Sequence, residues 1–377
     1  MPSRYRLSPK PSRPATRQGR AADRTPFEEM EPIPNAASAD AWGGWLGEGL
    51  GPLKSLYMST GARPAGGSNP SKIWRLDEGS EEWVDDETPE GAEVINKIRS
   101  NASTVYAFFE SPGEGQTWII SKSLEHSGSG GWDFENIHTV PTPVGGRGLA
   151  INGPEGELLF AGCSQNWAGE QTAEVYQKSG GGWEKTRELA PSLMWELEFD
   201  DEDNLWEFFS AFAEGQESGL FVGGEEKTIP PGANISHACW FKGQMYVTGN
   251  LSMEESSKIY RSTDGSEWEE VHTFSEASIG DHVQMVPRGE EGELWAVGHD
   301  PFEAAWSLDG MEWTREESIP SFATGVDTNH LTAIAYYGPD VDDEKERGVY
   351  LFARDQEADT TRIFRDRGAG SLMLQII

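Results

Sequence analysis

Three histidines recur at one position of a repeating pattern in the second half of the chain. His237, His282 and His330 each stand just before a short apolar stretch, and Arg147 takes the same place in an earlier copy. Imidazole nitrogens bind a metal ion when neutral and an anion when protonated, so these residues are candidates to line a channel. The competing interpretation is that this position of the repeat simply tolerates a polar side chain beside water. We favour this second interpretation, because successive copies of a repeat would hold the histidines far apart.

Two acidic runs are the other candidates for ligand chemistry. Residues 200–203 (Asp-Asp-Glu-Asp) and 340–344 offer the oxygen ligands that Ca²⁺ prefers. Neither run has the spacing of a known calcium loop, and both fall in expected turns, so solvated turns are the preferred interpretation. The sequence has no phosphate-binding loop, no dinucleotide fingerprint and no paired-cysteine metal motif. We therefore predict no metal and no cofactor, with Ca²⁺ as the one exception to test.

The elements that would position these residues are short strands that recur about every fifty residues. A turn followed by an apolar strand appears seven times, and the intervals between its anchor residues are 49, 53, 47, 40, 49 and 55. The anchors are Tyr57, Tyr106, Leu159, Trp206, Tyr246, Trp295 and Tyr350. A further apolar stretch precedes the strand in several copies. Units of three or four short strands that stack on their neighbours are typical of a β-propeller.

A hairpin follows the apolar strand in several copies of the repeat. In its two clearest copies, 259–268 and 305–313, an aromatic residue precedes an Asp-Gly turn and a tryptophan follows it. Asp-Gly is a strong hairpin signal, because glycine tolerates the positive φ that a tight turn requires. The residues concerned are Asp264, Gly265, Trp268, Asp309, Gly310 and Trp313. We predict structural roles for all six, with the tryptophans packed on a flanking unit.

These two hairpins resemble the Asp-box of sialidase-type (BNR) propellers, although both lack one residue that the family has between the Asp and the Gly. The resemblance implies a propeller in which the Asp-box is structural and lies away from the catalytic face. A sialidase-like enzyme would also need three arginines around a carboxylate, a tyrosine nucleophile backed by a glutamate, and an aspartic acid. The early Arg-Ile-Pro signature is absent, and of Arg147, Arg288 and Arg315 only Arg147 starts an inner strand. We therefore predict that the chain is not an enzyme.

The predicted fold is all-β: a seven-bladed β-propeller over residues 41–377, preceded by an extended arm over residues 1–40. Six or eight blades are the nearest alternatives, and a pair of β-sandwiches or a β-helix are the more distant ones. The composition agrees with this class, because 44 Gly and 15 Trp among 377 residues suit many short strands joined by turns.

The arm and the body differ in charge. Residues 1–24 carry seven basic side chains and one acidic one, within a chain whose net charge is −34. The seven are Arg4, Arg6, Lys10, Arg13, Arg17, Arg20 and Arg24. With four prolines and little apolar surface this segment is not expected to fold alone, so we predict that it binds a partner. The acidic body would repel nucleic acid and anionic membranes, and salt would relieve its self-repulsion, which indicates a saline environment.

No apolar run is long enough to span a bilayer and no secretion signal is visible, so we expect assembly inside the host cytoplasm. Together these features predict a non-catalytic scaffold whose arm contacts protein subunits of the same large assembly. By analogy of fold, our preferred setting is a virion: a tail, baseplate or head–tail component of a virus with a halophilic host. The alternative is a glycan-binding or sialidase-like propeller that acts on cell-surface glycans.

Overall fold

The computed structural model describes the chain in segments between Phe27 and Asp366. They are residues 27–34, 57–60, 72–77, 82–86, 94–100, 105–111, 117–123, 134–141, 146–152, 158–165, 172–179, 182–190, 192–210, 218–230, 234–250, 256–274, 284–287, 292–298, 302–320, 332–337, 348–355 and 360–366. Every regular element within these segments is a strand, and hydrogen bonds join the strands into seven antiparallel sheets. The all-β prediction is confirmed.

Six of the sheets follow one another along the sequence. The first holds β3 (Tyr57–Thr60), β4 (Lys72–Asp77) and β5 (Glu82–Asp86), and the second holds β6 (Val94–Ser100), β7 (Val105–Ser111), β8 (Thr117–Ser123) and β9 (Phe134–Pro141). The third holds β10 (Gly146–Asn152), β11 (Leu158–Gln165), β12 (Thr172–Ser179) and β13 (Gly182–Leu189), and the fourth holds β14 (Leu193–Phe199), β15 (Leu205–Ser210), β16 (Gly219–Val222) and β17 (Glu225–Lys227). The fifth holds β18 (Asn234–Phe241), β19 (Gln244–Asn250), β20 (Lys258–Ser262) and β21 (Glu269–Thr273), and the sixth holds β22 (Gln284–Pro287), β23 (Leu294–Gly298), β24 (Glu303–Ser307) and β25 (Trp313–Arg315).

The last sheet joins the two ends of the described chain. It holds β26 (Thr332–Tyr337), β27 (Gly348–Asp355) and β28 (Thr360–Asp366), and two short strands, β1 (Glu28–Glu29) and β2 (Ile33–Pro34), pair with β28. The Met30 N–H donates to the Ile363 carbonyl at 2.9 Å. The Arg362 guanidinium donates two hydrogen bonds to the Glu29 carboxylate, at 2.7 and 2.8 Å. Part of the segment that the sequence predicted as an arm therefore belongs to the propeller body.

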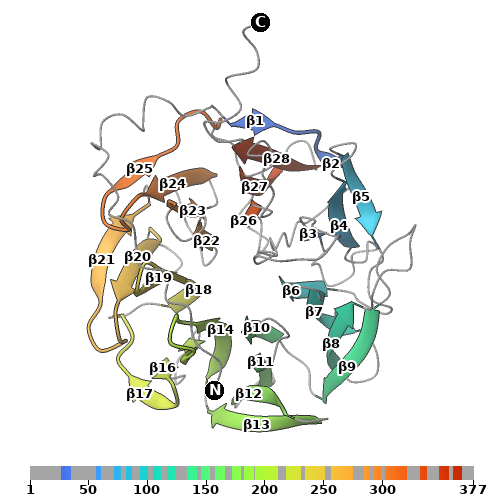
Figure 1. Ribbon diagram of the computed structural model, residues 1–377, viewed down its shortest axis with the longest axis vertical. Helices are drawn as coiled ribbons and strands as arrows, with labels where there is room; N and C mark the ends of the chain where they lie inside the picture. The colour runs from blue at the N-terminus through green and yellow to red at the C-terminus, as the bar shows by residue number, and fades with distance from the viewer. Residues whose placement is uncertain are drawn as a thin grey trace, which may run out of the picture.

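The sheets are set around a central axis, as Figure 1 shows. The first strand of each four-stranded sheet lies nearest the centre and the fourth lies at the rim. Consecutive inner strands contact one another from β6 through β10, β14, β18 and β22 to β26. This arrangement is a β-propeller, as the repeat predicted.

The burial of each strand follows from its distance from the axis. The sequence Leu-Trp-Ala-Val-Gly of β23 is buried along its whole length, because neighbouring sheets cover both of its faces. The outer strand β13 has no buried residue, and its residues are exposed or half-buried, as expected for an edge strand that faces water. A continuous apolar run therefore marks a strand covered on both faces, and a polar run marks the rim.

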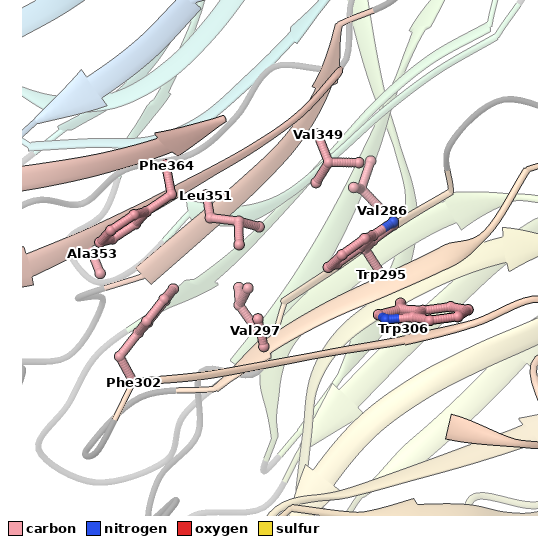
Figure 2. Close-up of a cluster of buried hydrophobic side chains, with 10 residues drawn as sticks. Val286, Trp295, Val297, Phe302, Trp306, Val349, Leu351, Ala353 and Phe364 are labelled. Atoms are coloured by element: carbon pink, nitrogen blue, oxygen red, sulfur yellow. The ribbon is translucent and has the colours of Figure 1, made fainter. Parts of the chain in front are cut away.

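The core consists of apolar clusters between successive sheets. Figure 2 shows the cluster between β22–β25 and β26–β28, which gathers Val286, Trp295, Val297, Phe302, Trp306, Val349, Leu351, Ala353 and Phe364. Phe27, just before β1, packs against the same cluster, with its ring edge-on to Trp295 at 5.4 Å between centroids. Burial of apolar surface at about 25 cal/mol per Å² makes these inter-sheet layers the main stabilising contacts. The N-terminal strand is therefore held by packing as well as by hydrogen bonds.

One irregularity recurs on four inner strands. The register of β6, β10, β14 and β18 against the next strand skips one residue, at Asn96, Arg147, Trp195 and Ser236 respectively. Such a bulge bends the strand and changes the direction of the residues beside it. The repeated bulge aligns these four inner strands residue by residue, and it defines equivalent positions around the central axis.

Candidate functional site

The bulge shows where the predicted channel residues lie. His237 is the residue after the bulge of β18, and it is buried, with 8% of its surface exposed. Arg147 is the bulged residue of β10 itself, so the two are offset by one place. His282 and His330 lie outside the described residues. His237 and Arg147 therefore lie on the first strands of their sheets, and the channel-lining role of the four residues stays a prediction.

A glutamate that the sequence analysis did not select takes the place equivalent to His237 on the neighbouring sheet. Glu196 follows the bulge of β14, is fully buried, and lies 3.8 Å from the guanidinium of Arg99 on β6. One of its oxygens accepts the Leu197 N–H at 3.1 Å. A charged residue inside the apolar run from Leu193 to Phe199 was the signal that could have identified it.

The thiol of Cys239 lies two residues along β18 from His237. Burial raises the pKa of this thiol well above its ordinary value, and the carboxylates of Glu198 and Glu196 add to the increase. A reactive cysteine needs the opposite shift, because the thiolate is the nucleophile. Cys239 is also part of an apolar cluster with Phe241. We assign it to the core and not to catalysis.

Other buried carboxylates connect strands or sheets through cationic partners. Glu207 of β15 accepts from Arg187 of β13 at 2.8 Å, across a sheet boundary, and Glu174 of β12 accepts from Lys185 at 2.9 Å. Burial raises the pKa of Glu207, and the positive charge of Arg187 opposes that increase. Each of these two carboxylates is therefore held in an ion pair with a basic side chain on another strand.

The two predicted Asp-Gly hairpins are present and have the expected turn chemistry. Gly265 and Gly310 have φ of 77° and 73°, in the left-handed region. Asp264 Oδ1 accepts from the Ser266 N–H at 2.9 Å, and Asp309 Oδ1 accepts from the backbone N–H groups of residues 311 and 312 at 3.0 and 3.1 Å. Each aspartate thus caps its own turn, as a structural hairpin requires.

The tryptophans of the hairpins pack as predicted. Trp268 donates its indole N–H to the Thr228 carbonyl at 2.6 Å and packs on the cluster around Trp206, in the preceding sheet. Trp313 packs on the cluster around Phe274 and stacks on His272, with 5.3 Å between ring centroids. Each hairpin therefore anchors its sheet to the one before it.

A pocket of about 600 Å³ lies between β14–β17 and β18–β21, at the end of the sheets where four turns meet. These turns join β14 to β15, β16 to β17, β18 to β19 and β20 to β21, and we call this end of the molecule the turn face. The pocket, called the turn pocket below, is lined by Asp200, Asp201, Glu202, Asn204, Trp206, Val222, Gly223, Glu225, Lys227, Trp240, Gly243, Thr263 and Asp264. Five of these residues are carboxylates and one is a lysine, which leaves four negative charges.

Both oxygens of the Asp200 carboxylate accept hydrogen bonds from groups of its own turn. Its Oδ1 accepts from the backbone N–H groups of Glu202 and Asn204, both at 2.9 Å. Its Oδ2 accepts from the Asn204 side chain and from the indole N–H of Trp206, both at 3.0 Å. Asp200 therefore shapes the acidic turn, and Asp201 and Glu202 stand exposed beside it.

The described residues contain no group of three or more His, Cys, Asp or Glu side chains that could hold a metal ion. The acidic run at 200–203 lies within the described residues, and the run at 340–344 lies outside the described residues. Within the described segments no helix has the length and apolar character that crossing a membrane requires. The seven predicted arm residues, Arg4, Arg6, Lys10, Arg13, Arg17, Arg20 and Arg24, lie outside the described residues.

Comparison with known proteins supports the fold. No protein-family description and no curated protein matches the sequence. An oligogalacturonate lyase from Vibrio parahaemolyticus is similar over 90% of this chain and 96% of its own, with a TM-score of 0.56 and 12% identity. YCF48 bound to a D1 peptide is similar over 91% and 95% (TM-score 0.51, 15% identity), and the BP39L lectin from Burkholderia pseudomallei over 87% and 95% (TM-score 0.51, 15% identity). At such low identities the likeness establishes the propeller fold alone.

Proposed function

We propose that this chain is a seven-bladed propeller that acts as a non-catalytic scaffold, tethered by its basic N-terminal arm to protein subunits of a large assembly. The observation that carries the proposal is the way the arm is rooted. From here on the arm means residues 1–26, the part of the predicted 1–40 segment that precedes the described residues. The segment that follows it forms the outer strands β1 and β2 of the last sheet, which two hydrogen bonds from Arg362 to Glu29 help to hold. Because these strands belong to the last sheet, a partner that binds the arm would be connected directly to the propeller body and not through a loose linker.

The charge distribution supports the same function. The arm contributes +6 and the rest of the chain is strongly acidic, so the arm fits an acidic protein surface. Among the described residues, the buried carboxylates of Glu174, Glu196 and Glu207 lie beside basic side chains, which suits a structural role for these three groups. A virion of a virus with a halophilic host is the setting we propose, since high salt would screen the repulsion within the body.

The experiment that tests the tether compares three forms of the chain in the native host. They are the full chain, a form that lacks residues 1–26, and a form of full length in which the seven basic arm residues are glutamine. The proposal predicts that both altered forms remain folded but fail to enter the large particle in sedimentation. Normal entry of the form without residues 1–26 would refute the tether. The glutamine form separates the effect of charge from that of length.

A second function, glycan binding, is favoured by one observation. Trp240 lines the turn pocket beside carboxylates, and an aromatic wall with polar groups is the chemistry that binds sugar rings. One of the structural neighbours is named as a lectin. Binding of a neutral glycan by the purified chain, lost on changing Trp240 to alanine, would favour this function over the scaffold.

A further inference from the structure

The turn pocket has a chemistry that the scaffold function does not use. Its four net negative charges surround Trp240, which is half-buried and lies against the fully buried Trp206, with 6.1 Å between ring centroids. Lys227, its one cation, already pairs with Glu225 at 3.1 Å. A guanidinium group binds a carboxylate through two parallel hydrogen bonds and can stack on an indole ring. Proline rings also pack on tryptophan. The pocket therefore suits a segment that contains both arginine and proline.

The chain itself contains such a segment. Residues 1–26 carry seven basic side chains, one acidic side chain and five prolines. A neutral sugar would leave the carboxylates of the pocket without counter-charge, whereas this segment neutralises them. Charge complementarity thus favours the arm over a glycan as the occupant.

The register of the last sheet places the root of the arm at the turn face. Glu28 is opposite Arg365, and the next residue along β28, Asp366, is opposite Val349 near the start of β27. The start of β27 is the end where β26 and β27 come together, since Gly348 is opposite Tyr337. In the fourth and fifth sheets, the end at which the first and second strands are joined carries the turns that line the pocket. The chain therefore enters β1 from the same face on which the turn pocket opens.

The length of the arm is sufficient to reach the pocket of the same molecule. Twenty-six extended residues span up to about 90 Å, whereas a compact chain of this size has a radius of gyration of about 21 Å. A segment tethered within reach has an effective concentration on the order of millimolar, which favours the chain's own pocket over that of another copy.

We propose that the turn pocket binds the basic N-terminal segment, residues 1–26, of the same chain. Arginine side chains contact the exposed carboxylates of Asp201 and Glu202, and an arginine or proline side chain packs on Trp240. In the free chain the arm is held at its own turn face. This inference goes beyond the proposed function and does not depend on it, because it concerns the chain without a partner.

Photo-crosslinking of the full-length chain tests this inference. Tyr5 is replaced by p-benzoylphenylalanine, the purified monomer is irradiated, and the linked peptides are identified by mass spectrometry. We expect links within one molecule to the turns at 200–206, 223–227 and 240–243. Raising the salt from about 0.1 M to about 1 M should reduce their yield. Links spread over the surface without preference for the pocket would overturn the proposal, and so would pocket links found only in crosslinked dimers, which indicate a second copy as the occupant.

Charge variants of the full-length chain supply the control. The pair Asp201→Asn and Glu202→Gln should lower the yield of pocket links by about threefold to tenfold, as expected for the loss of two exposed ion pairs. The matched pair Glu184→Gln and Glu317→Gln removes two exposed carboxylates outside the pocket and should leave the yield unchanged. Equal yields from both pairs would overturn the proposal. Because no partner is present, this result is independent of the sedimentation test of the tether.

Discussion

Gly310, at the tip of the hairpin between β24 and β25, lies against the side chain of Tyr246 in the preceding sheet. A Cβ atom at position 310 would collide with the hydroxyl and the ring of that tyrosine. Gly265 repeats the relationship one sheet earlier, where a Cβ atom would lie 3.1 Å from Leu220 and 3.2 Å from Lys227. Glycine is therefore favoured at both positions for two reasons: the backbone has a positive φ, and the neighbouring sheet leaves little room for a Cβ atom.

Comparing Gly310→Ala with Gly243→Ala separates the cost of the contact with Tyr246 from the cost of placing alanine at a positive φ. Gly243 also has a positive φ, 78°, but nothing lies within 4 Å of a Cβ atom there, so Gly243→Ala should cost about 1–2 kcal/mol from φ alone. Gly310→Ala should cost a further 1–3 kcal/mol or so from overpacking against Tyr246. Denaturant unfolding of both variants measures the difference. Equal losses would show that the hairpin does not press on the preceding sheet.

The Arg187–Glu207 pair should behave as a coupled unit between two sheets. The guanidinium lies 2.8 Å from the carboxylate and 3.7 Å from the centre of the Phe221 ring. Arg187→Met should destabilise the chain by about 3 kcal/mol near neutral pH, because it leaves a buried charge without a partner. Adding Glu207→Gln should recover much of that loss.

The loss caused by Arg187→Met should also depend on pH. The folded pKa of Glu207 is raised above its unfolded value, and losing Arg187 raises it further, so the neutral carboxyl is the form that folding favours. The penalty should therefore shrink as pH falls towards the unfolded pKa near 4.5. Strictly additive losses in the double variant, with no pH dependence, would contradict this account.

His272 should make stability depend on pH between about 5 and 7. Burial lowers the pKa of its imidazole below 6.5, and Glu303 opposes that shift only partly. The unfolded chain then binds the proton more readily, so the free energy of unfolding should fall as pH drops through 6.5. The His272→Phe variant keeps the stacking on Trp313 and removes the titration, so its stability should vary less over this range. An identical pH profile for the variant would exclude a role for His272.

Truncation separates the arm from the outer strand. Removing residues 1–26 should lower the melting temperature only slightly, because it removes the exposed ion pairs proposed at the turn pocket and leaves the outer strand in place. Removing residues 1–34 eliminates the Glu29–Arg362 pair, the packing of Phe27 and the buried side chain of Ile33, which is 1% exposed. Loss of two apolar anchors should cost about 3 kcal/mol or more. Identical melting of the two truncated forms would show that β1 and β2 are not part of the propeller.

The sequence allowed the inner parts of the sheets to be predicted, because burial on two faces demands continuous apolar runs such as the one in β23. It also allowed the hairpins to be predicted, since Asp-Gly determines a tight turn from local chemistry alone. It did not reveal β1 and β2, because strands of two residues have no alternation and their pairing with β28 spans more than 300 residues. The turn pocket was equally hidden, since turns from four separate hairpins meet there. Glu196 could have been recognised as a charge in an apolar run.

The central claim is that the N-terminal strand completes the last sheet of a propeller and roots the basic arm at its rim. An experimental density map of the full-length chain tests this most directly. The account predicts residues 28–29 and 33–34 on the outer edge of the same sheet as 348–355 and 360–366, with Glu29 bound to Arg362 of the same molecule. A map in which those residues pair with another sheet, or with a second molecule, would contradict it.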